Sequence, residues 1–207
     1  MSFELIGKKL RMTSLPRDDG STTPVTLIEL YPLVVTQVKT PETDGYWALQ
    51  VGYDQVAGHR LNKPELGHQK GIEGLPCKRL MEFRLDGPAE YQVGEILPWG
   101  IVSEGTTVKV IGRTKGRGFT GVMKRHHFKG AKDTHGTSQV HRKAQSGGAT
   151  DAARVFKGVK KPGHYGNTRS TALNLKVVEL DESNGLLVLK GSVPGANGDI
   201  IRIVPQE

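Results

Sequence analysis

The sequence has 207 residues, which suits one large domain or two small ones, and a formal net charge of +8. Its single cysteine, Cys77, excludes an internal disulfide and favours a reducing compartment. No apolar run approaches the roughly 20 residues needed to cross a bilayer, and the first residues lack the charged and long apolar regions of a secretory signal peptide. We therefore expect a cytoplasmic protein.

Positive charge is concentrated in one segment, Lys109–Arg169. This segment holds fifteen Lys or Arg against two acids, a net charge of +13, whereas the other 146 residues carry a net charge of −5. It contains no leucine, but eleven of the 27 glycines and five of the seven histidines. So few large apolar groups cannot offset the entropy of ordering, so we expect a polyanion, above all a nucleic acid, to order it. Membrane binding is disfavoured, because bulky apolar anchors in an amphipathic pattern are missing.

Short β-strands are predicted on both sides of this segment. Runs at 25–30 and 33–39 are followed by one at 46–51, by a short helix over 64–70 with proline at its first position, and by 78–83, which is ambiguous between helix and strand. Further strands are predicted at 108–111 and 200–204. Alternation over 173–177 and the return run 186–190 flank the clearest hairpin, where Asn184-Gly185 would supply the positive φ angles of a tight turn. Many short strands with glycine and proline turns are typical of a barrel or sandwich.

The basic segment predicts mainly an extended loop, with one or two turns of helix over 150–157 capped by Thr150. A loop of this length counts against a compact domain unless it lies against a partner, and its charge supplies that reason. We therefore predict a body made of residues 1–112 and 170–207, with a short helical insert near 64–83, and a basic extension over 113–169.

Gly116–Gly121 matches the pattern G-x-G-x-x-G directly after a predicted strand, which is the position of a dinucleotide-binding loop. Such a loop needs a helix after it and an acidic residue about 20 residues further on. The following residues are basic and glycine-rich, and the region near 140 is basic as well. We favour the alternative, in which glycines let the backbone approach phosphates that Arg113, Lys115 and Arg117 neutralise.

The histidines of the segment raise the question of a metal or catalytic site. Zinc sites usually show paired thiols or a helical H-E-x-x-H spacing, so a remote cysteine and scarce acids disfavour a metal. A hydrolase triad of Asp133, His135 and Ser138 is disfavoured because nothing in the sequence places these residues on a rigid scaffold. Histidines in a cationic loop more often stack on bases or donate to phosphate and ribose. Two roles stay open for the aromatic residues of the segment, stacking on unpaired bases or filling small local cores: Phe119, Phe128, Phe156 and Tyr165.

At these residues the chain resembles the family of bacterial-type large-subunit ribosomal protein L-three, nearly end to end. Ile6–Thr13 resembles the opening block of the family, and Leu187–Ala196 resembles its closing block. Between them, the most specific matches lie in the basic segment: Thr114–Phe119, His135-Gly136, His141-Arg142 and Arg154–Gly158. Some members carry a methylated glutamine between the last two of these, but no residue here matches it, so this modification is not assigned to Gln145.

The resemblance implies a mainly β fold, a closed β-barrel of the translation-protein type, from which a long basic and largely irregular extension threads into ribosomal RNA. It implies a structural constituent of the large subunit in the cytoplasmic ribosome, which binds near the 3′ end of the large-subunit rRNA, nucleates assembly and extends a loop toward the peptidyl-transferase centre. Ribosomal proteins L-fourteen and L-nineteen are the implied neighbours. It implies no enzyme activity, cofactor, metal or small-molecule substrate, because the RNA performs the peptide-bond chemistry.

Candidate RNA-binding residues follow from charge and from the matched blocks. Lys and Arg would neutralise phosphates, and glycine-rich backbone would read RNA shape and 2′-hydroxyls. Two alternatives stay open: a free RNA-binding protein or RNA chaperone with the same electrostatics, and an enzyme that uses the glycine-rich loop for a nucleotide. The candidates are Lys8, Lys9, Arg113, Lys115, Arg117, Lys124, Arg125, His126, His127, Lys129, His135, His141, Arg142, Lys143, Arg154, Lys157, Lys160, Lys161, His164 and Arg169.

Overall fold

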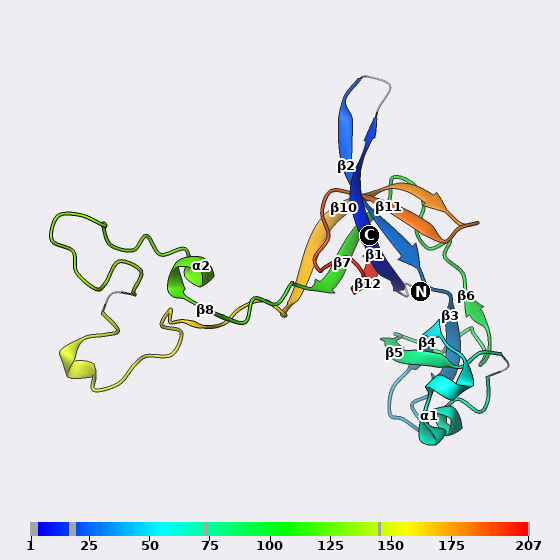
Figure 1. Cartoon of the computed structure of the whole chain (residues 1–207). Helices are drawn as coiled ribbons and strands as arrows, with labels where there is room; N and C mark the ends of the chain where they lie inside the picture. Colours follow the sequence, from blue (N-terminus) through cyan, green and yellow to red (C-terminus); the bar gives the residue numbers. More distant parts are fainter. Residues whose placement is uncertain (1–3, 17–19, 73, 145, 207) are drawn as a thin grey trace. The chain divides into compact units, whose positions relative to one another are not determined.

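The structure, a computed structural model, describes residues 4–16, 20–72, 74–144 and 146–206 (Figure 1). Gln145 therefore lies outside the described residues. The chain divides into two compact units. The first, called the body, comprises Met1–Gly112 and Ser170–Glu207, and the second, called the basic unit, comprises Arg113–Arg169.

The body is built mainly from β-strands, as the sequence predicts. Six strands among the described residues form its first sheet. The last strand in the order, β2, pairs with β11 on one side and with the first strand, β1, on the other, so the strands form a ring. Alternate side chains of each strand point to the same face, and in β11 Leu187 and Leu189 are fully buried. They pack with Leu5, Ile201 and Ile203 in one apolar core. The strands of this sheet, in order, are β1 (Leu5–Pro16), β12 (Ile200–Pro205), β7 (Thr107–Arg113), β10 (Arg169–Asp181), β11 (Leu186–Lys190) and β2 (Thr22–Leu30).

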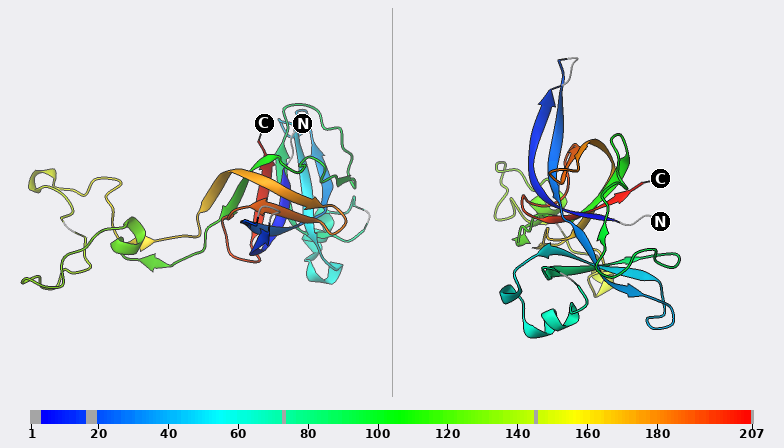
Figure 2. Two further views of the ribbon diagram at one scale, coloured as in Figure 1. Left: turned by 90° about the horizontal axis from the view of Figure 1, so that it is seen from above. Right: turned by 90° about the vertical axis from the view of Figure 1, so that its right-hand side faces the viewer.

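β1 is a long strand that apolar patterning did not predict, because lysines and Arg11 interrupt its apolar residues. Its first residues pair with β12, and the strand then continues along β2 as far as Pro16. The register shifts between Lys9 and Arg11, which marks a β-bulge. Figure 2 shows the resulting β1–β2 ribbon extending beyond the neighbouring strands of the body. Gly7 is required where these strands meet, because a Cβ there would lie 2.5 Å from Cγ2 of Ile28.

A second sheet forms a separate part of the body, in the order β5-β4-β3-β6. Its buried residues include Val35, Leu49 and Phe83, and Ile6 of β1 also belongs to this second core. The predicted strands at 33–39 and 46–51 therefore belong to this second sheet and do not join the first. The strands are β3 (Leu33–Lys39), β4 (Ala48–Gln55), β5 (Cys77–Arg84) and β6 (Ile96–Leu97).

The predicted helical insert near 64–83 is only half right. A 3-10 turn, η1 (Gly58–Arg60), precedes this stretch, and a helix, α1 (Lys63–His68), begins it. At the start of α1 the backbone amide of Asn62 donates to Glu65 Oε2 at 2.8 Å. The remainder is strand β5, which pairs with β4 and buries Phe83 in the second core. Ladder hydrogen bonds and this burial resolve the ambiguity that a short apolar run leaves open.

The predicted hairpin of β10 and β11 is confirmed, but its turn works differently from the expectation. Only Gly185 of the expected pair has a positive φ, of 62°. Asn184 instead donates its side-chain amide to Asp181 Oδ2 at 2.6 Å, and the Ser183 hydroxyl donates to Asp181 Oδ1 at 2.6 Å. These hydrogen bonds, led by that from the Ser183 side chain, lower the pKa of Asp181 to about 2.

The basic unit contains little regular structure. The helix predicted over 150–157 is a single 3-10 turn, η2 (Thr150–Ala152), with Ala149 rather than Thr150 at its N-cap, and it ends at Ala153 with φ of 48°. Val155 and Phe156 remain exposed, so this stretch lacks the apolar packing that stabilises a short helix. The other elements are β8 (Phe119–Thr120), α2 (Val122–His126) and β9 (Gly163–His164). Within the described ranges of the chain, no helix is long and apolar enough to cross a membrane.

Candidate nucleic-acid interface

The two ends of the basic unit pair with each other as an antiparallel stem. The amide of Thr114 donates to Thr168 O at 2.9 Å, and the amide of Arg117 donates to Tyr165 O at 2.9 Å. β8 and β9 extend this pairing. Gly166 has φ of 74°, and a Cβ there would lie 2.1 Å from Lys115 O. The close backbone approach of the two arms therefore depends on this glycine.

The G-x-G-x-x-G motif at Gly116–Gly121 belongs to this stem. It is followed by α2, which has only five residues and begins at Val122. A dinucleotide loop lies between a parallel strand and a full helix of a βαβ unit, whereas the pairing here is antiparallel. The motif therefore shapes the stem, and its context differs from that of a dinucleotide site.

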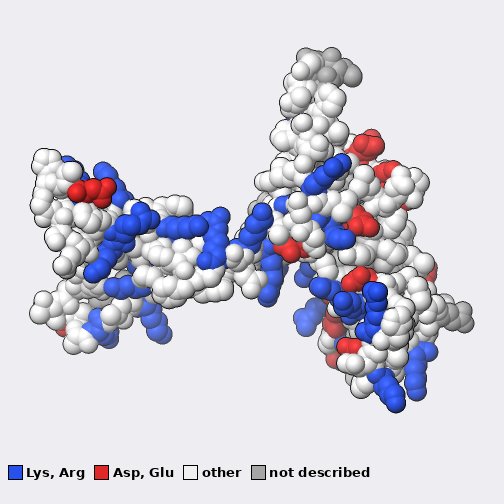
Figure 3. Space-filling model, in the orientation of Figure 1, with Lys and Arg blue, Asp and Glu red and all other residues white. Residues whose placement is uncertain are grey.

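Cations in the basic unit lie exposed around this stem and the loops beyond it. The unit carries fourteen Lys or Arg against two acids, a net charge of +12, whereas the body has a net charge of −4. Figure 3 shows basic side chains spread over the basic unit and mixed charges over the body. Most of the candidate residues are exposed: Arg113, Lys115, Arg117, Lys124, His127, Lys129, His135, Arg142, Lys143, Arg154, Lys157, Lys160, Lys161, His164 and Arg169.

Among the described residues of the basic unit, two arginines lie over aromatic rings. The Arg117 guanidinium lies 5.3 Å from the centroid of the Tyr165 ring, and that of Arg154 lies 5.2 Å from the centroid of Phe156. Such cation–π contacts hold a guanidinium in place while its edge stays open to a phosphate. Phe119 is 81% exposed, so its ring presents a face that no local core covers.

Lys9 requires a correction. It is only 6% exposed, and its ammonium donates to Val193 O at 2.9 Å and to Gly195 O at 3.0 Å. A charge held in this way fixes the loop between β11 and β12 and cannot reach a phosphate. Neighbouring residues on a strand point to opposite faces, so Lys8 and Lys9 cannot share one surface, but the pair by itself does not show which of them is buried. Lys8 is half-exposed and lies 3.7 Å from Glu29 Oε2.

Three further candidates have structural partners inside the basic unit and are half-buried. Arg125 donates through Nη1 to Lys161 O at 2.7 Å, and His126 Nε2 lies 3.3 Å from the same oxygen. The Nδ1 atom of His141 lies 3.0 Å from Lys132 O and 3.3 Å from Asp133 Oδ1. These side chains connect different loops, so they position the surface that the exposed cations form.

The hypothetical triad is not assembled. Asp133 faces His141, while His135 and Ser138 are exposed on the loop. Among the residues that the structure describes, no three His, Cys, Asp or Glu lie close enough together to hold a metal ion.

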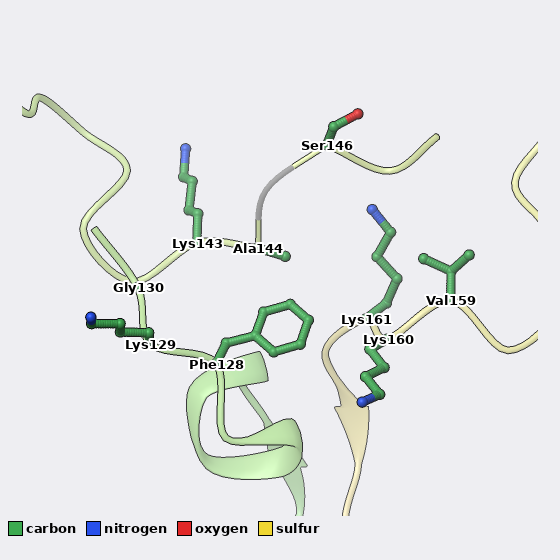
Figure 4. A pocket seen from close by; sticks show the side chains of 9 residues that line it. All are labelled: Phe128, Lys129, Gly130, Lys143, Ala144, Ser146, Val159, Lys160 and Lys161. Carbon is green, nitrogen blue, oxygen red and sulfur yellow. The ribbon is translucent and has the colours of Figure 1, made fainter. Parts of the chain in front are cut away.

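Sequence reasoning missed two features. The first is Lys132, which is exposed in the same loop but is not among the candidates. Its position in the strongly basic segment was a sufficient signal. The second is a cavity of about 390 Å³ (Figure 4), which residues from three separated stretches assemble, so no sequence pattern reveals it. Its lining consists of Phe128, Lys129, Gly130, Lys143, Ala144, Ser146, Val159, Lys160 and Lys161.

Sequence comparison shows which known proteins this chain resembles. A family model described as ribosomal protein L3 matches residues 96–186, which include the whole basic unit. Proteins named large ribosomal subunit protein uL3 are 46% identical in Petrotoga mobilis, over 96% of this chain and 93% of the relative, and 41% identical in a Picosynechococcus species, over 99% and 97%. The protein of that name from Clavibacter michiganensis is 45% identical over 95% of this chain and 91% of the relative. This family consists of structural proteins rather than enzymes, and the chain belongs to the ribosomal protein L3 family.

Proposed function

We propose that this protein is a structural constituent of the large ribosomal subunit in the cytoplasm and that its basic unit binds large-subunit rRNA. The observation that carries the proposal is the separation of charge: a net +12 on a unit with little apolar core, beside a body of −4. Neutralising phosphates releases counterions, so such a unit gains affinity for RNA in proportion to the phosphates that it contacts. The near-full-length similarity to proteins of the large ribosomal subunit supports the same function.

In this proposal the two units have different tasks. The ring of six described strands in the body is the closed barrel of the translation-protein type, which docks on the RNA surface. The basic unit penetrates the RNA near the 3′ end of the large-subunit rRNA, nucleates assembly and extends toward the peptidyl-transferase centre. Ribosomal proteins L-fourteen and L-nineteen are its neighbours. The resemblance of the matched blocks supports these finer assignments.

Charge substitution in the full chain tests RNA binding. In the basic unit, Lys124, Lys129 and Lys157 are exposed, and their simultaneous change to Gln removes three candidate phosphate contacts. We expect the slope of log K against log salt for purified large-subunit rRNA to fall by about 2 to 3, because each contact contributes roughly 0.7 to 0.9. The matched control changes three exposed lysines of the body to Gln and should leave the slope unchanged: Lys63, Lys70 and Lys78.

Deletion of residues 122–160 tests the division of tasks. We expect a folded body that binds rRNA poorly, and full affinity in this deletion would contradict the proposal. Sucrose-gradient sedimentation of a lysate in high salt separates the alternatives. Migration with the large subunit indicates an integral ribosomal protein, whereas release into the soluble fractions favours a free RNA-binding protein or RNA chaperone.

A further inference from the structure

The cavity of the basic unit combines an aromatic ring with cations. The ring of Phe128 points into the space, and Val159 and Lys161 lie on its other side (Figure 4). Four of the lining residues are lysines and none is acidic. A volume of about 390 Å³ lies within the range of pockets that hold small ligands, roughly 300–1,000 Å³.

Internal contacts hold the two walls of this cavity in place. His126 lies beside Phe128, with ring centroids 6.2 Å apart, and its Nε2 lies 3.3 Å from Lys161 O. Arg125 donates to that same oxygen at 2.7 Å. The C-terminal end of α2 is thereby tied to the stretch that carries Lys161. Because the backbone on both sides of the cavity is joined in this way, a ligand between the ring and the lysine meets walls that are already in place.

The Lys161 ammonium lies beside Gly147 at the edge of the cavity. A Cβ on Gly147 would lie 2.8 Å from Lys161 Nζ, so the absence of a side chain at Gly147 leaves room for the ammonium. On the Phe128 side, Gly130 has φ of 74°, and a Cβ there would lie 2.5 Å from His141 O. Both glycines therefore permit the close approach of loops that forms the cavity.

We propose that this cavity binds a single unpaired nucleotide of RNA, with the base against Phe128 and Val159 and the phosphate beside Lys161. The inference rests on the proposed function and names the form of RNA that one part of the basic unit recognises. Aromatic stacking and nearby cations together are the means by which proteins hold unpaired bases.

Other ligands fit these residues less well. A duplex stacks its bases internally and cannot insert one into a cavity without unpairing it. An isolated phosphate would use the lysines but would gain nothing from the Phe128 ring. An apolar peptide segment would offer no negative charge to the lysines of the lining.

Two RNA hairpins of equal length and charge provide the test with the full-length protein. One carries a single 2-aminopurine in a one-nucleotide bulge, and the other carries it paired in the stem. We expect about tenfold tighter binding of the bulged hairpin, and quenching of 2-aminopurine fluorescence in that hairpin only, because stacking on an aromatic side chain contributes on the order of tenfold or more per base. The quenching arm uses the unaltered protein, so it does not depend on the folding of any variant.

Matched variants locate the effect. Phe128→Leu keeps an apolar side chain but removes the ring, and we expect it to abolish the preference for the bulge while affinity for the paired hairpin stays unchanged. Phe156→Leu is the control for the preference, because Phe156 is half-exposed in the same unit and does not line the cavity. Through the contact of Phe156 with Arg154, it should change binding of both hairpins alike and leave the preference for the bulge intact. Lys161→Gln should weaken binding of the bulged hairpin more than of the paired one, and Lys157→Gln should weaken both equally.

The outcomes separate this inference from the proposed function. Equal, strongly salt-dependent binding of both hairpins by the unaltered protein overturns the nucleotide site and leaves rRNA binding standing. Weak, salt-independent binding of both would instead contradict the proposed function. A preference that survives Phe128→Leu, or that Phe156→Leu removes equally, also overturns the inference.

Discussion

Lys9 offers the sharpest test of whether tertiary structure or local charge decides the role of a lysine. The substitution Lys9→Met keeps the length of the side chain and removes the ammonium that donates to Val193 O and Gly195 O. Each hydrogen bond to a charged group contributes about 1.5–3 kcal/mol, and the relief of burying a charge offsets part of the loss. We therefore expect the free energy of unfolding to fall by about 3 kcal/mol. For a domain of this size, that corresponds to a drop in melting temperature of about 6–12 °C.

Urea unfolding, followed by tryptophan fluorescence, measures this change, because Trp99 packs against the first core. The salt dependence of rRNA binding is measured on the same variant and should be unchanged. Lys115→Met is the matched control, since Lys115 is exposed in the basic unit. It should leave stability within about 0.5 kcal/mol and lower the salt slope by about 1. Normal stability with a lowered salt slope in Lys9→Met would show that Lys9 contacts RNA and would refute the assignment.

Three further substitutions test other parts of the chain. Gly166→Ala forces a Cβ toward Lys115 O, so amides of the stem should exchange hydrogen faster, whereas Gly136→Ala, with open space around it, should change exchange less; equal effects would count against the steric reason. The Asp181 carboxyl should titrate near pH 2 by NMR, below its ordinary 3.8. Its contribution to stability is then complete above about pH 4 and is lost as the pH falls toward 2, and Asp181→Asn should remove this dependence; a titration near 3.8 would contradict it. Arg125→Gln removes the hydrogen bond to Lys161 O, so backbone amides in the walls of the cavity should exchange hydrogen faster, while the melting temperature of the body stays unchanged.

Strands and charge could be predicted from the sequence because both are local properties. Alternation and turn residues predicted the β10–β11 hairpin and the strands that became β2, β3, β7 and β12. β1 was missed because its lysines break the apolar pattern. One of them, Lys9, is buried and hydrogen-bonded to carbonyl oxygens that lie 184 and 186 positions further along the chain. No local pattern carries information about such distant partners.

The sequence by itself determined that the chain has a β-rich body and one segment of high positive charge, because side-chain periodicity and charge are set by neighbours along the chain. Tertiary structure decided which of those charges remain available. Lys9 is buried in the body, Arg125 is hydrogen-bonded to a carbonyl far away in sequence, and Phe128 and Lys161 line the same cavity. These placements depend on contacts between stretches far apart in sequence, and the loss of chain entropy in forming them is offset only when the whole fold assembles.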